Sequence, residues 1–158
     1  MQIRFATPAD VPAILNLLRQ VGKVHSDGRP DIFRLGAQKY SASQVLSMLD
    51  DPMQPIFIAA EGEQVLGYGF CQIQTYEKDP VMTDRTELYL DDLCVDESTR
   101  GKGVGKALYF AIRDYAKQRK CHSVSLNVWS CNESAYKFYV NLGLTPRKTY
   151  MEERLDAE

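Results

Sequence analysis

The chain contains a glycine-rich run whose residue types suit an anion. Arg100–Lys106 reads Arg-Gly-Lys-Gly-Val-Gly-Lys, with three glycines at alternating positions and three cationic side chains. It lies between a strand-like segment and a segment of helical periodicity, so a helix should begin near Gly103. The first N–H groups of a helix have no partner within it, and glycines let the backbone come close to a ligand. The expected ligand is a diphosphate.

Two common phosphate-binding motifs do not fit this run. A Walker loop needs Gly-x-x-x-x-Gly-Lys-Ser/Thr, but Ala107 follows Lys106 and Arg100 stands where the first glycine should be. A Rossmann fingerprint counted from Gly101 would need its third glycine at position 106, and no suitable acidic residue follows the next strand. A nucleotide-binding protein of either kind is therefore disfavoured.

What the run does match is a signature of six residues. Arg100–Gly105 resembles Gln/Arg-x-x-Gly-x-Gly/Ala, the acetyl-CoA signature of the GNAT superfamily of N-acetyltransferases. Further on, Asn132–Leu144 is similar to that family's Asn-x-x-Ala-x-x-x-Tyr-x-x-x-Gly-Phe stretch, with Leu144 in place of the final Phe. An apolar strand end, here Leu93–Val95, precedes the loop as in the family. The resemblance covers essentially the whole chain.

The resemblance implies a fold and a cosubstrate. The fold is α/β (α+β): a GNAT-like mixed, mostly antiparallel central sheet flanked by helices, with splayed parallel strands at the cofactor site. In that family the pantetheine arm of acetyl-CoA lies between the splayed strands, and no metal is required. The cofactor-binding residues that the resemblance implies are Leu93, Cys94, Val95, Arg100, Gly101, Lys102, Gly103, Val104, Gly105, Lys106, Asn132 and Tyr139.

Acetyl transfer to a primary amine needs a proton acceptor and a proton donor. A free amine has a pKa of about 10.4, so a carboxylate or a water linked to it must remove a proton before the amine attacks. By resemblance, Tyr139 lies near the thioester sulfur, where its phenol is the candidate acid. Strand alternation places Glu87 and Asp91 on one face and Asp92 on the other. Asp91 is the favoured base and Glu87 the second choice, and a β-bulge would shift these faces.

The expected function is that of an enzyme, an acetyl-CoA-dependent N-acetyltransferase that acetylates a primary amine by direct attack. Cys94 is disfavoured as a nucleophile because no histidine is placed to activate it. The alternative is a non-catalytic acyl-CoA-binding regulatory module. Leu90–Leu93 resembles an acidic pair in spermidine/spermine N-acetyltransferases, which suggests cationic amines. The acceptor itself stays open among small amines, polyamines and protein or peptide amines.

The elements that must position these residues can be outlined from the sequence. Thr7 and Asp10 form a capping box at the start of a helix, and Gly22 is a plausible end of it. The further elements expected are a helix over 43–49, strands over 55–60, 65–75 and 86–95, a helix from about 103, a strand over 123–129, a helix over 132–142 and one or two strands over 144–155.

Length and composition limit the alternatives. The 158 residues fit one N-acetyltransferase domain spanning residues 1–158. A net charge of −2 disfavours a nucleic-acid partner. The absence of a secretory signal and of a long apolar run disfavours a membrane and favours the cytoplasm. Four cysteines and two histidines lack the spacing of a zinc site. Dimerisation is common in the family, which leaves a homodimer open.

Overall fold

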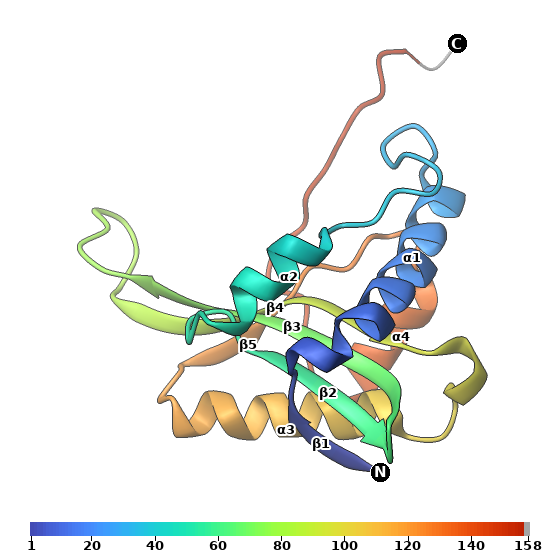
Figure 1. Cartoon of the computed structure of the whole chain (residues 1–158). Coiled ribbons are helices and arrows are strands. Elements are labelled where there is room, and N and C mark those ends of the chain that lie inside the picture. The colour runs from blue at the N-terminus through green and yellow to red at the C-terminus, as the bar shows by residue number, and fades with distance from the viewer. Residues whose placement is uncertain (157–158) are drawn as a thin grey trace.

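The computed structural model describes residues 1–156 of the chain. The strands are β1 (Gln2–Phe5), β2 (Ile56–Glu61), β3 (Gln64–Tyr76), β4 (Arg85–Val95) and β5 (Ser123–Ser125), and the helices are α1 (Val11–Gly28), α2 (Ala42–Leu49), α3 (Val104–Gln118) and α4 (Glu133–Asn141), with short 3-10 turns η1 (Pro8–Asp10) and η2 (Glu97–Thr99). The five strands form one sheet in the order β1-β2-β3-β4-β5. Neighbours are antiparallel except the parallel pair β4 and β5. Helices α1 and α2 cover one face and α3 the other (Figure 1), which confirms the predicted fold class.

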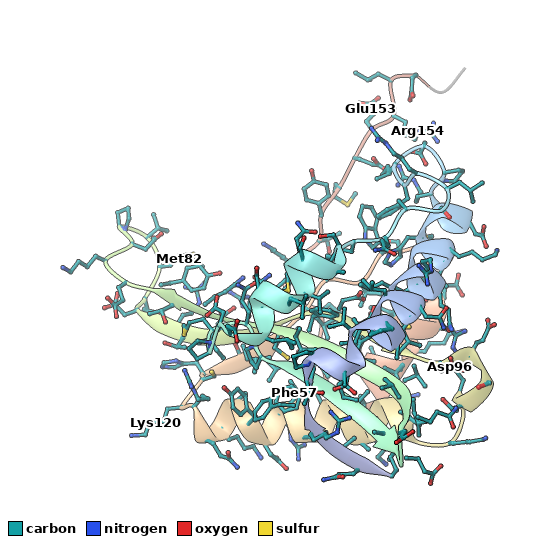
Figure 2. The ribbon with its side chains drawn as sticks, in the orientation of Figure 1. Phe57, Met82, Asp96, Lys120, Glu153 and Arg154 are labelled. Atoms are coloured by element: carbon teal, nitrogen blue, oxygen red, sulfur yellow. The ribbon has the colours of Figure 1, made fainter. Side chains whose placement is uncertain are left out.

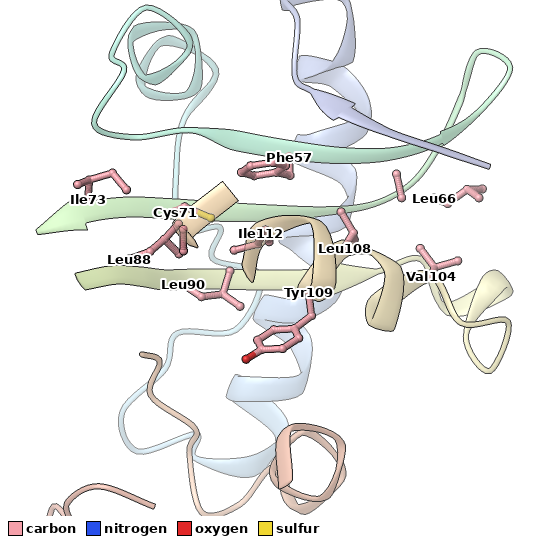
Figure 3. Packing of buried hydrophobic residues seen from close by; sticks show 12 residues of the cluster. Phe57, Leu66, Cys71, Ile73, Leu88, Leu90, Val104, Leu108, Tyr109 and Ile112 are labelled. Carbon is pink, nitrogen blue, oxygen red and sulfur yellow. The ribbon is translucent and has the colours of Figure 1, made fainter. Parts of the chain in front are cut away.

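Each face of the sheet carries its own apolar cluster. On the α3 side, Ile112 is fully buried near Leu88 and Leu90 of β4 (Figure 3). On the α1 side, Leu18 is fully buried with Tyr68 of β3. Burying one such aliphatic side chain contributes about 2 kcal/mol, so these clusters are what fix both helices on the sheet. The sheet can therefore present side chains of β4 to either layer at defined positions.

Strand β4 has one residue more than its partner β3 at a bulge. Phe70 pairs with Asp92 and Cys71 pairs with Leu90, so Asp91 has no residue opposite it. A bulge of this kind puts two successive residues on the same face. Asp91 and Asp92 accordingly both point to the α1–α2 side, while Leu90 belongs to the α3-side cluster. Strict alternation, which would separate the two aspartates, was wrong here.

Helix α1 begins as predicted but ends later. The Thr7 backbone N–H donates to Asp10 Oδ2 at 2.7 Å, which confirms the capping box. The helix runs past Gly22 to Gly28. A Cβ on Gly22 would lie 2.6 Å from the carbonyl oxygen of Ala37, so this glycine allows the α1–α2 connection to approach the helix rather than ending it.

The C-terminal part departs most from the sequence prediction. Strand β5 stops at Ser125, and residues 144–156 form no strand within the described part of the chain. This segment is extended and runs away from the sheet, with Glu153 and Arg154 near its far end (Figures 1 and 2). Tyr150 is 97% exposed and Met151 81%. A strand needs a neighbour to pair with, and alternation in the sequence could not tell that none is present here.

None of the helices within residues 1–156 combines the length and the apolar character needed to cross a membrane.

Candidate functional site

The Arg100–Lys106 loop leads into α3 with its backbone amides available. Gly101 and Gly103 have φ angles of 78° and 79°, in the left-handed region that favours glycine. Gly103 is the N-cap of α3, and no side chain caps the helix. Outside the helix itself, no backbone carbonyl within residues 1–156 accepts a hydrogen bond from the amides of residues 100–106. The partial positive charge of the helix end therefore remains available to an anion.

The loop is cationic at its surface and close-packed underneath. Arg100, Lys102 and Lys106 are all exposed, whereas Gly105 is buried. A Cβ on Gly105 would come within 3.1 Å of Cζ of Phe138, a half-buried residue of α4. The glycine run thus serves two purposes, because it frees backbone amides at the surface and lets α4 pack against the start of α3.

Strands β4 and β5 pair over three residues and then separate. The parallel ladder joins Glu87 to Ser123 and ends where Tyr89 meets Ser125. Strand β4 continues to Val95 with no strand of the described chain on that side. The separation of the two parallel strands agrees with the predicted fold and leaves one edge of Leu90–Val95 open to an extended partner.

Helix α4 brings Tyr139 to this region. Asn132 caps the helix, because its Oδ1 accepts from the Ala135 N–H at 3.2 Å. Tyr139 is half-buried and packs against the α3-side cluster. Burial raises the pKa of its phenol, and the nearby Asp92 and Tyr109 raise it further. The Tyr139 hydroxyl therefore keeps its proton at neutral pH and can act as a donor.

Asp92 is the carboxylate of β4 whose charge raises the pKa of Tyr139. It is half-buried, and the Tyr68 hydroxyl donates to its Oδ2 at 2.8 Å. Burial raises the pKa of Asp92 to about 6, although the Tyr68 hydrogen bond and the Lys39 ammonium both lower it. A carboxylate with this pKa is mostly charged at neutral pH and still basic enough to take up a proton.

The neighbouring Asp91 is held by two residues of the connection between α1 and α2. Lys39 Nζ lies 3.0 Å from Asp91 Oδ1, and the Tyr40 hydroxyl donates to Oδ2. The Asp91 side chain is only 11% exposed, so its charge is largely shielded from water. Asp91 thus already binds an ammonium group in this structure.

Glu87 lies elsewhere in the sheet, where its buried carboxylate pairs with two arginines. Its Oε1 accepts from Arg85 at 2.7 Å and from Arg147 at 2.8 Å, and Ser125 donates to Oε2 at 3.3 Å. Burial alone would raise the pKa of Glu87, but the hydrogen bonds from the two arginines outweigh it and lower the pKa. A carboxylate stabilised in this way is a poor proton acceptor.

The Cys94 thiol is also unsuited to covalent chemistry. It is buried against α1, where it donates to the carbonyl oxygen of Leu17 at 3.5 Å. Burial raises the pKa of Cys94 to about 12, so the reactive thiolate is rare at neutral pH.

Comparison with known proteins decides the family. The model of the acetyltransferase (GNAT) family matches residues 20–144. The chain belongs to the GNAT family. A variant of the BH1408 protein from Bacillus halodurans is 31% identical to this GNAT chain, with a TM-score of 0.94 over 98% of this chain and 99% of that one.

More distant solved structures share the fold of this GNAT chain. A putative acetyltransferase from Agrobacterium tumefaciens is 21% identical, with a TM-score of 0.72 over 98% of this chain and 99% of that one. An aminoglycoside acetyltransferase from an uncultured soil metagenomic sample, in complex with sisomicin, is 15% identical, with a TM-score of 0.71 over 99% of this chain and 96% of that one.

The structure of this GNAT chain brings some candidate residues together and adds others. Asp91 and Asp92 lie together on the α1–α2 side, Tyr139 packs against the α3-side cluster, and Glu87 is held apart by its arginines. Sequence reasoning missed Lys39 and Tyr40, because no pattern marks the connection that contains them. Two surface hollows lie at α2 and the loop after it, the second reaching Phe5 and Tyr115, and neither is lined by a residue of this group. Within residues 1–156, no three His, Cys, Asp or Glu side chains converge as a metal site would require.

Proposed function

We propose that this GNAT chain is an N-acetyltransferase that transfers the acetyl group of acetyl-CoA to a primary amine by direct attack. The observation that carries this proposal is the uncapped, glycine-rich start of α3, which packs against the end of β4 where the β4–β5 ladder has stopped and against α4, the helix that contains Tyr139. A Cβ on Gly105, at the start of α3, would lie 3.4 Å from Val95 at the end of β4 and 3.1 Å from Phe138, the residue before Tyr139.

The residues present fit acetyl-CoA. The amides of Gly101–Lys106 and the cationic side chains around them would hold the diphosphate, and the open edge at Leu93–Val95 would pair with the extended pantetheine arm. Asn132 lies at the start of α4 and would contact the same molecule. When bound, acetyl-CoA supplies an activated acetyl thioester.

The chain's own groups divide the remaining work. Asp91 binds the ammonium group of the acceptor, as it binds Lys39 here. Asp92 takes up the proton that the amine must lose, for which its raised pKa suits it. Tyr139 donates a proton to the thiolate that leaves. The role of base, for which the sequence favoured Asp91 and then Glu87, is here given to Asp92; Asp91 becomes an acceptor-binding residue and Glu87 a structural one.

The same carboxylates favour a class of acceptor. Two adjacent aspartates on one face attract a cationic amine, and such amines occur in small polyamines and in protein side chains or N-termini. One structural relative acts on aminoglycosides, which also have cationic amines. We therefore place the acceptor among cationic primary amines.

A homodimer is part of the proposal. The extended segment 144–156 exposes Tyr150, Met151 and Leu155, and exposed apolar side chains of this size are typical of contact surfaces. A second copy would cover them. Light scattering of the wild type should give twice the chain mass, and replacing all three residues by serine should reduce it to one.

The decisive experiment measures thiol release from acetyl-CoA with a panel of cationic amines. Replacing Tyr139 by Phe should lower kcat about 100-fold while coenzyme binding persists, because only the proton donor is lost. The matched control is Tyr136→Phe, since Tyr136 lies on the same helix but is 49% exposed, and it should leave kcat unchanged. Tight coenzyme binding without turnover of any amine would support the non-catalytic module instead. A burst of protein with a thioester-linked acetyl group on a cysteine would contradict direct attack.

A further inference from the structure

A primary amine of the chain already occupies the proposed acceptor position. Lys39 Nζ is 3.0 Å from Asp91 Oδ1 and 3.2 Å from the Asp91 carbonyl oxygen. Its ammonium group also lowers the pKa of Asp92, and Asp92 in turn raises that of Tyr139. An amine in contact with Asp91 is thus close enough to affect Asp92, whose charge in turn affects Tyr139, and acetyl transfer to an amine needs groups of these kinds.

Lys39 differs in this respect from the other lysines that form ion pairs within residues 1–156. Lys23 pairs with Asp27 on the surface of α1, and that carboxylate is 58% exposed. The carboxylate partners of Lys117 and Lys137 are 59% and 81% exposed. The partner of Lys39 is 11% exposed, although the Lys39 side chain is itself 45% exposed. Lys39 thus combines a shielded acidic partner with a side chain that retains freedom to move.

We propose that Lys39 is a site of self-acetylation, modified within the same chain by the acetyl-CoA that this chain binds. The inference rests on the proposed function. It assigns to Lys39 the role of an internal acceptor that competes with external amines for Asp91. Because the amine is tethered beside the carboxylates, its effective concentration there is high.

The step balances as an ordinary aminolysis of a thioester. The Lys39 ammonium loses one proton to Asp92, and the Nζ lone pair forms a bond with the acetyl carbon as the carbon–sulfur bond breaks. The second proton of the ammonium ends on the coenzyme thiol, and Asp92 returns the first to solvent. The products are an uncharged acetamide on Lys39 and free thiol, and one proton is released.

Modification would change the acceptor position. Acetylated Lys39 has no charge, so its ion pair with Asp91 is lost and the carboxylate becomes available. The two aspartates would then attract an external cation without competition. Self-acetylation would in this way favour cationic acceptors over neutral ones.

The test uses the full chain with unmodified Lys39, incubated with acetyl-CoA and no other amine. Peptide mass spectrometry over time should show one acetyl group on Lys39 appearing roughly tenfold faster than on Lys23, the exposed and ion-paired control in the same chain. The rate constant should not depend on protein concentration. Lys39→Arg, which keeps the charge, should lack the fast modification and still bind acetyl-CoA in calorimetry.

The outcomes separate this inference from the proposed function. Equal rates at Lys39 and Lys23 would indicate spontaneous acetylation and overturn the inference. A rate constant that grows with protein concentration would mean transfer between chains and would also overturn it. A chain that acetylates free amines but leaves Lys39 unmodified refutes the inference alone. A chain that binds no acetyl-CoA refutes the proposed function as well.

Discussion

The Tyr68 hydroxyl donates a 2.8 Å hydrogen bond to Asp92 Oδ2 from the neighbouring strand. This bond stabilises the charged carboxylate and holds down a pKa that burial raises to about 6. In Tyr68→Phe the pKa of Asp92 should therefore rise further, and the acidic limb of the kcat/KM profile should move to higher pH. Tyr76→Phe removes an exposed hydroxyl from the end of the same strand and serves as control. An unshifted limb in Tyr68→Phe would exclude Asp92 as the group that titrates.

Because burial disfavours the charged form of Asp92, this carboxylate destabilises the folded protein near neutral pH. Its folded-state pKa of about 6 lies above the ordinary value, so the stability from protonated Asp92 is present below about pH 4 and lost as pH rises through 6. Asp92→Asn should raise the free energy of unfolding by about 2 kcal/mol near neutral pH and change it little at about pH 4. Urea unfolding at the two pH values measures this. Equal effects at both would show that Asp92 does not titrate as described.

Glu87 should behave in the opposite way. Its pKa is lowered by Arg85 and Arg147, so its contribution to stability is present above the ordinary pKa and is lost as pH falls through the folded-state value. Glu87→Gln leaves two arginines without their buried partner and should cost about 3 kcal/mol at neutral pH. The difference from wild type should shrink below about pH 4. If kcat fell strongly while unfolding was unchanged, Glu87 would be a catalytic base after all.

Gly103 links backbone conformation to coenzyme affinity. Its φ of 79° would strain an alanine, and Gly103→Ala should cost about 1 kcal/mol of stability and weaken acetyl-CoA binding about tenfold, because the first amides of α3 would be displaced. Gly62→Ala is the matched control. Gly62 has a φ of 59° and open space around it, but it lies in the β2–β3 turn, so it should lose similar stability and no affinity. Calorimetry of unfolding and of acetyl-CoA binding for both variants distinguishes the effect of backbone strain on stability from a loss of coenzyme affinity.

The sequence predicted the parts of the fold in which local chemistry and topology agree. The helix start at Thr7, the β2–β3 hairpin and the start of α3 after Gly103 are each determined by nearby residues. The prediction that the first helix ends at Gly22 was wrong, because this glycine allows Ala37 to approach the helix closely. Ala37 is distant in sequence, and no local pattern encodes such a contact. The prediction of one or two strands over residues 144–155 was wrong, because an extended segment becomes a strand only when another strand pairs with it.

The candidate site was predictable to the extent that motifs mark it. The loop at 100–106 and Tyr139 were implied by the resemblance to GNAT motifs; in the structure Gly105 packs against Val95 of β4, and Tyr139 packs on the cluster that includes Leu93 and Val95. The bulge that brings Asp92 next to Asp91 depends on the register of β3, so strand alternation alone could not find it. Lys39 and Tyr40 reach the site through the path of the α1–α2 connection, and only the three-dimensional structure shows it.

Because only three residues of β4 and β5 are paired, this part of the molecule should open locally more readily than the rest of the sheet. Helix α4 has no buried residue, whereas α3 has six, so the side of the molecule that contains Tyr139 is held by few interactions. Its amide hydrogens should exchange with solvent through local opening, at a free energy well below that of global unfolding. A ligand that pairs with β4 and contacts α4 would connect the two elements and stabilise this region against local opening. Acetyl-CoA would then act as the missing part of the sheet, and slowed exchange in α4 would record its arrival.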